Sequence, residues 1–171
     1  MPAVVLFFVA LAVMIMESAF LGAAPIQFWA LQTPLMVAIY LGLERDFVPG
    51  ALILVFLLPP MEWLVGGIYG LYSVGGVVVF FLLRGLRPNL QNMWGVVRGL
   101  VAAVAALIHA AVMLAILHLI GEGGSSLASV VARQMWWSAP IVGVGAVVMG
   151  KGFARIDQLL DPGRKGTSLE I

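Results

Sequence analysis

Long runs of apolar residues, unbroken by charge, constrain this chain more than any other feature. Residues 99–120 contain no Asp, Glu, Lys or Arg. A helix needs about 20 predominantly apolar residues to cross the hydrocarbon core of a bilayer, so this segment is typical of a membrane span. Over the whole chain 63% of residues are hydrophobic and 10% are charged, whereas a soluble domain has about 45–50% and about 25%. Because so few polar residues cannot cover a water-facing surface, we predict an all-α integral membrane protein.

We expect a compact bundle of about six transmembrane helices. Their expected ranges are residues 3–21, 28–43, 49–63, 68–83, 99–120 and 139–153. An amphipathic segment, residues 127–137, is expected before the last span. Six spans use about 120 residues and leave only tight loops, so residues 1–160 are predicted to form a single transmembrane domain. Residues 161–171 are expected to be a short, disordered cytoplasmic tail.

The basic residues predict the orientation of the bundle. With the N-terminus inside, Arg133 is the one basic residue expected on the outer side. The others fall on the cytoplasmic side: Arg45, Arg84, Arg87, Arg98, Lys151, Arg155, Arg164 and Lys165. Cytoplasmic loops carry an excess of Lys and Arg, so both ends are predicted to lie inside. A five-span alternative, with the third and fourth spans merged, places the two large basic clusters on opposite sides.

The third span contains two consecutive prolines. Pro59 and Pro60 remove two backbone donors, so this span is expected to be kinked or broken there. Gly66 and Gly67 follow and are expected to form a hinge before the fourth span.

Small residues recur at four-residue spacing in the last two spans. Helices in lipid associate through close packing of such residues. The expected packing positions are Gly95, Gly99, Ala103, Ala106 and Ala110 in the fifth span and Gly150 in the sixth. Since Ala and Gly are common in any membrane helix, the alternative is that these spacings arise by chance.

Two acidic residues lie inside the predicted membrane segments. Glu17 and Glu62 are expected near the outer ends of the first and third spans, and Arg133 is expected on the same side. Trp136 and Trp137 suit a membrane–water boundary. These five residues form a candidate polar cluster that binds a partner or a small ligand, and the alternative is that each carboxylate has a structural partner.

No set of residues predicts catalysis or a cofactor. His109 and His118 lie on opposite faces of the fifth span, and His109 is expected to bond a neighbouring backbone carbonyl. The chain has no cysteine, no phosphate-binding loop and no pattern typical of a metal site. The net charge of +1 gives no indication of nucleic-acid binding. We therefore expect a protein that is not an enzyme and has no metal or cofactor.

Several short segments together resemble one family. The second span opens with Pro34 and runs through aliphatic residues to Tyr40. Gly50 opens the third span, and Glu62 stands where that family usually has Asp, with Gly67 or Gly70 after it. A basic turn, residues 84–87, follows the fourth span. In this order the segments resemble the rod-shape-determining protein MreD, and the resemblance covers residues 3–160.

The resemblance implies a fold, a function and partners. MreD-like proteins are six-span proteins of the bacterial cytoplasmic membrane, and their fold is similar to the substrate-binding S-components of ECF vitamin transporters. They belong to the cell-elongation complex that guides side-wall peptidoglycan synthesis. The implied partners are the bitopic protein MreC, the MreB filament, and the RodA glycosyltransferase with its penicillin-binding transpeptidase. The expected function is thus a non-enzymatic membrane scaffold, with membrane lipids as further partners of its basic inner face.

Two other functions remain open from the residues alone. A vitamin-binding S-component has the same six-span profile and predicts a tightly bound small molecule. A small enzyme acting on a lipid-linked substrate needs a reactive set at one interface, for which the candidates are Glu17, Glu62, His118 and Arg133.

Overall fold

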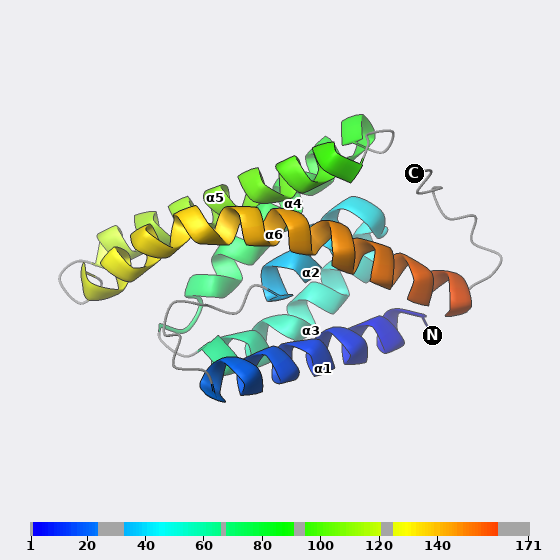
Figure 1. The fold of residues 1–171 in the computed structure, drawn as a ribbon, viewed down its shortest axis with the longest axis horizontal. Coiled ribbons are helices and arrows are strands. Elements are labelled where there is room, and N and C mark those ends of the chain that lie inside the picture. The colour runs from blue at the N-terminus through cyan, green and yellow to red at the C-terminus, as the bar shows by residue number, and fades with distance from the viewer. Residues whose placement is uncertain (1, 24–32, 66–67, 91–94, 121–124, 161–171) are drawn as a thin grey trace.

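The structure is a computed structural model, and it describes residues 2–23, 33–65, 68–90, 95–120 and 125–160. These residues form six α-helices and the short connections between some of them. The helices are α1 (Pro2–Ala23), α2 (Thr33–Glu44), α3 (Phe47–Val65), α4 (Leu71–Leu90), α5 (Gly95–Ile120) and α6 (Ser125–Leu160) (Figure 1). These residues contain no strand, so the prediction of an all-α protein is confirmed.

Four of these helices are long and apolar enough to cross a membrane. Their apolar segments are Phe47–Leu64, Leu71–Leu90, Gly95–Ile120 and Ala128–Ile156. Shorter apolar helical segments are Val4–Ala19 in α1 and Thr33–Glu44 in α2. The chain therefore has the character of a multi-pass membrane protein.

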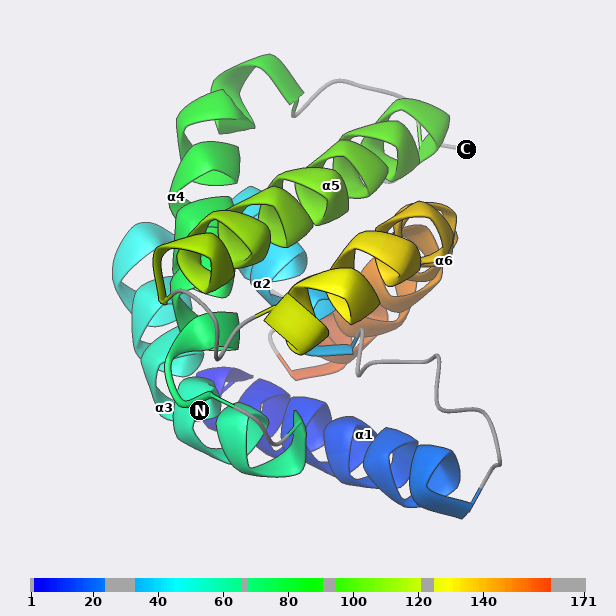
Figure 2. The same ribbon diagram turned by 90° about the vertical axis from the view of Figure 1, so that its left-hand side faces the viewer.

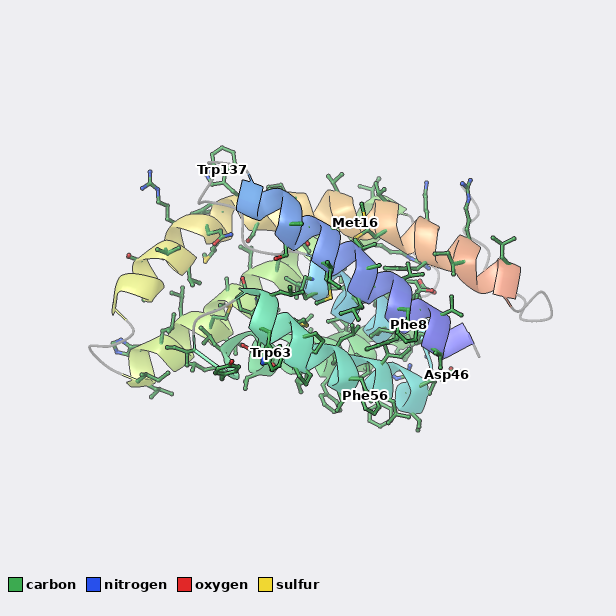
Figure 3. The ribbon with its side chains drawn as sticks, turned by 90° about the horizontal axis from the view of Figure 1, so that it is seen from below. Phe8, Met16, Asp46, Phe56, Trp63 and Trp137 are labelled. Atoms are coloured by element: carbon green, nitrogen blue, oxygen red, sulfur yellow. The ribbon has the colours of Figure 1, made fainter. Side chains whose placement is uncertain are left out.

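Large apolar side chains cover the outside of the bundle. Figure 3 shows Phe8, Met16, Phe56, Trp63 and Trp137 projecting away from their helices, and each is at least 60% exposed. Soluble proteins rarely expose apolar patches of this extent. Lipid tails make such an exterior stable, because in a bilayer these side chains meet hydrocarbon rather than water.

Helix α2 lies at the centre and contacts all five other helices. Seen along the bundle, it is enclosed by them (Figure 2). Every residue from Thr33 to Gly42 is buried. Its 12 residues make a helix of about 18 Å, which is shorter than the hydrocarbon core of about 30 Å. Pro34 lies in the first turn of α2, where its missing N–H removes no helical hydrogen bond.

The chain runs back and forth along the bundle. The first turn of α1, the last turn of α6 and the connection between α2 and α3 lie toward one end, on the right in Figure 1. Helices α5 and α6 pack along each other most extensively, and α6 arches across the bundle with Pro140 inside it.

Several expected helix boundaries are wrong. Helix α3 is not broken at Pro59 and Pro60 but continues to Val65. The reason is that Leu57 and Met61, on either side of the prolines, are both buried in the same core cluster and hold the two parts of the helix in place. The expected hinge residues, at positions 66 and 67, lie outside the described residues.

Helices α4 and α6 are longer than expected. Helix α4 continues through the expected basic turn at residues 84–87 and past Pro88 to Leu90. The amphipathic segment at 127–137 is not separate from the last span, because α6 is one helix of 36 residues. Ser138 lies just before Pro140, and its hydroxyl donates to the carbonyl of Met135 over 3.0 Å. The expected tail, residues 161–171, lies outside the described part.

Candidate functional site

Glu62 caps the start of α4. Its Oε1 accepts a hydrogen bond from the backbone N–H of Ser73 over 2.7 Å and another from the Ser73 hydroxyl over 2.6 Å. The first N–H groups of a helix lack intrahelical acceptors, and a negative charge near them is stabilised by the helix dipole. Glu62 is buried, at 7% exposure, so its carboxylate depends on these bonds in place of water.

Glu17 does the same for α2. Its Oε2 accepts a hydrogen bond from the backbone N–H of Thr33, the first residue of α2, over 3.1 Å. Thr33 is buried, so this N–H lies away from solvent. The two predicted carboxylates therefore each tie one helix to the next helix along the chain: α1 to α2, and α3 to α4.

His109 joins α5 to the start of α4. The imidazole is buried and forms a hydrogen bond with the backbone of Tyr72, as expected from the sequence. The rings of Tyr72 and His109 lie with their centroids 5.3 Å apart. Gly75 makes room for the imidazole, because a Cβ at that position would lie 2.6 Å from Cδ2 of His109. The neighbouring Gly76 has no such contact.

A small cavity lies beside this histidine, between α2, α4, α5 and α6. Its polar lining comes from Tyr72, His109, Gln134 and Ser138, and its volume is about 30 Å³. That is room for a few water molecules at most, since one water needs at least 10–15 Å³ of such space. The cavity is thus a polar gap within the bundle rather than a chamber for a large ligand.

The other members of the predicted polar cluster do not join the carboxylates. Arg133, Trp136 and Trp137 are exposed on α6, with the two tryptophans at 71% and 74%. The carboxylates of Glu17 and Glu62 instead bond to helix starts inside the bundle. The predicted cluster is therefore divided into two carboxylates that bond to helix starts and three exposed residues on α6. Within the described residues, no group of three or more His, Asp or Glu is arranged to hold a metal ion.

Arginines bind the carboxyl end of α2, opposite to the start that Glu17 binds. Sequence reasoning missed this arrangement. Nη1 of Arg84 donates to the carbonyl of Arg45 over 2.6 Å, and Nη1 of Arg87 donates to the same oxygen over 3.0 Å. Arg98 forms an ion pair of 2.7 Å with Glu44. The last carbonyls of a helix lack intrahelical donors, so cations stabilise them. The sequence signal for this arrangement is the charged triplet at residues 44–46, of which Arg45 alone entered the prediction of orientation.

Small residues bring α5 and α6 into close contact. A Cβ on Gly99 would lie 3.2 Å from the carbonyl oxygen of Gly143, and a Cβ on Gly143 would lie 3.3 Å from Cβ of Ala103. The expected packing residues Ala106 and Ala110 are buried in this part of the bundle. The expected residues Gly95 and Gly150 make no such contact, because a Cβ at either position would meet no atom within 4 Å. Gly143 itself was not among the expected residues.

Replacing Gly75 with alanine is expected to destabilise the bundle by about 1–2 kcal/mol, because the added methyl group overlaps the buried His109 ring. The apparent melting temperature of the purified chain in detergent measures this. Gly76→Ala is the matched control and is expected to leave that temperature unchanged or raise it, since alanine favours a helix. Equal effects of the two substitutions would contradict the assigned contact. His109→Ala in the Gly75→Ala background is expected to recover part of the loss.

Comparisons with known proteins give no relative for this chain. No protein-family model matches it, and neither a curated protein nor a solved structure matches it significantly.

Proposed function

We propose that this chain is a non-enzymatic scaffold in a bacterial cytoplasmic membrane, resembling MreD in the complex for cell elongation. The observation that carries the proposal is the use of its buried and partly buried polar groups. Glu17, Glu62 and His109 bond to the starts of neighbouring helices, and Arg84 and Arg87 bond to the end of α2. Polar groups committed in this way hold a bundle together and leave little for chemistry on a substrate.

A six-span arrangement with both ends inside completes the proposal. Arg45, Arg84, Arg87 and Arg98 come together where α2, α4 and α5 meet, at the end of the bundle that also holds the two ends of the helical chain. Arg133 lies in the first half of α6, away from that end. This distribution of basic residues supports a cytoplasmic position for that end.

The size of the cavity favours a scaffold over a vitamin-binding S-component. A volume of about 30 Å³ holds water but not a vitamin-sized molecule, since ligand pockets are usually several hundred Å³. A vitamin bound in this cavity therefore requires the helices around it to move apart. The close contact between Gly99 of α5 and Gly143 of α6 opposes a separation of those two helices.

The exposed surface is where partners bind in this proposal. Trp136 and Trp137 are exposed on α6, and large aromatic side chains are frequent in the centres of protein interfaces. We assign this surface to the membrane segment of an MreC-like bitopic protein. RodA, its transpeptidase and the MreB filament are the further partners of the assembled complex.

Depletion of the chain in its rod-shaped host tests the function directly. We expect the cells to become round while peptidoglycan synthesis along the side wall declines, and we expect the tagged chain to co-purify with an MreC-like protein. Trp136→Ala together with Trp137→Ala is expected to reduce that co-purification, whereas Val148→Ala, at another exposed position of α6, is the matched control. Depleted cells that keep their rod shape would count decisively against the proposal. A stoichiometric small molecule released from the denatured protein would favour the S-component instead.

A further inference from the structure

Two basic side chains on α6 differ from the arginines that bind the end of α2. Lys151 and Arg155 are exposed, and neither forms a hydrogen bond or ion pair with another described residue. Arg84, Arg87 and Arg98 are partly buried and are engaged with the end of α2. Within the described part of this end, Lys151 and Arg155 are therefore the cations available to a ligand.

The two cations share one face of α6 with exposed apolar residues. Residues four apart lie on the same face of a helix, so Lys151 and Arg155 point in the same direction. Val144, Val148 and Leu159 continue this face and are 69%, 65% and 81% exposed. The face thus changes along the helix from apolar at Val144 and Val148 to basic at Lys151 and Arg155.

The opposite face of this part of α6 is used for packing. Val142 and Phe153 are buried, and Phe153 stacks against Tyr40 of α2 with ring centroids 5.1 Å apart. The basic and apolar face therefore points away from the bundle and toward the surrounding membrane.

The spacing along α6 places the two cations at a bilayer surface. From Trp137 to Arg155 the helix rises by about 27 Å, close to the thickness of the hydrocarbon core. Trp136 and Trp137 suit one membrane–water boundary, so Arg155 lies near the other boundary. Lys151 lies one turn deeper, and its long side chain can extend to the same level.

Gly152 leaves the helix surface open beside the two cations. A Cβ at this position would meet no atom within 4 Å, so a group of atoms can approach the backbone there. A phosphate next to Gly152 would meet the ammonium of Lys151 and the guanidinium of Arg155. The acyl chains attached to that phosphate would then lie along Val148 and Val144.

We propose that Lys151, Gly152 and Arg155, together with Val144 and Val148, form a binding site for an anionic phospholipid. The charge pattern selects this ligand, because the headgroup supplies a negative charge at the level of the cations and the acyl chains meet the apolar residues. The site does not depend on a role in cell elongation. It requires only that α6 crosses the membrane, so its test is independent of the depletion experiment.

Native mass spectrometry of the purified full-length chain tests the site. The chain in nonionic detergent is mixed with equal amounts of phosphatidylglycerol and phosphatidylcholine that carry the same acyl chains. We expect the wild type to retain phosphatidylglycerol in preference, by about fivefold or more, since a basic residue near an anionic surface contributes about that factor. The double variant Lys151→Gln/Arg155→Gln is expected to lose the preference, with a ratio near one.

Two further variants separate the site from a general effect of charge. Arg133→Gln removes an exposed cation from the other half of α6 and is expected to keep the preference. The exchange Lys151→Arg/Arg155→Lys keeps both charges and is expected to keep it too. Because the side chains of Lys151 and Arg155 have no partner among the described residues, the melting temperature without lipid is expected to stay unchanged in the two variants that replace them. An equal ratio in the wild type and the double glutamine variant would overturn the proposal. So would a wild type that retains both lipids equally, as expected if an acidic protein segment occupies this face instead.

Discussion

Gly143→Val is expected to have the largest effect of any single substitution on the contact between α5 and α6. A Cβ at residue 143 would lie 2.8 Å from the carbonyl oxygen of Gly99. Because that oxygen belongs to the backbone of α5, it cannot turn aside, and the two helices must move apart. We expect a loss of about 3 kcal/mol in the free energy of unfolding, measured by tryptophan fluorescence during thermal unfolding in detergent.

Gly150→Val is the matched control for this substitution. It places the same β-branched side chain in the same helix two turns later, where a Cβ would meet no atom within 4 Å. The cost in helix propensity is therefore shared, and the difference between the two variants reports the contact with Gly99. If both variants melt at the same temperature, α5 and α6 do not pack at Gly143.

Glu62→Ala is expected to have the second large effect. It leaves the backbone N–H and the hydroxyl of Ser73 without their common acceptor at a partly buried helix start. An unsatisfied buried polar group costs about 1–3 kcal/mol, and loss of a helix cap costs about 1 kcal/mol. We expect a total loss of about 3 kcal/mol, seen as a lower melting temperature in detergent.

Two variants resolve the role of the charge and of the hydroxyl at this cap. Glu62→Gln keeps an oxygen acceptor and removes the charge, so its loss is expected to be smaller than that of Glu62→Ala. Ser73→Ala removes one of the two hydrogen bonds and is expected to add little further loss in the Glu62→Ala background, because the two residues act as a pair. Additive effects of Glu62→Ala and Ser73→Ala would show that the carboxylate does not act through the Ser73 hydroxyl.

Sequence reasoning predicted the class of fold because hydropathy reports directly on the environment of a helix. The fifth span illustrates this: residues 99–120 were predicted, and α5 covers Gly95–Ile120. Proline was a poorer guide. Pro59 and Pro60 suggested a kink or a break, and the break is wrong, because burial of Leu57 and Met61 on both sides of the pair keeps α3 in one piece. A proline in the sequence identifies the backbone hydrogen bond that is lost, but it does not reveal how tightly the helix is packed at that point.

The candidate site was predicted by residue type but not by arrangement. Hydropathy singled out Glu17 and Glu62 because they are charges in apolar segments, and both are indeed polar groups inside the bundle. The donors to these carboxylates, Thr33 and Ser73, belong to other helices. No local pattern reveals which helix start lies near a given carboxylate. Four-residue spacing also failed to identify the contact, because it predicted both Gly95 and Gly99 as packing positions. Of these two, only Gly99 lies against α6.

The central position of α2 constrains the order in which the protein can assemble. This helix is made second, yet its last carbonyls are bound by side chains of α4, which emerge from the ribosome about forty residues later (the bonds join positions 39 and 42 apart in the chain). A short helix of about 18 Å gains little from entering lipid by itself. During synthesis the last carbonyls of α2 therefore lack their arginine donors until α4 has been inserted. Completion of the fold is thereby linked to the insertion of its fourth helix. In a chain cut short before residue 84, the carboxyl end of α2 lacks the hydrogen bonds from Arg84 and Arg87.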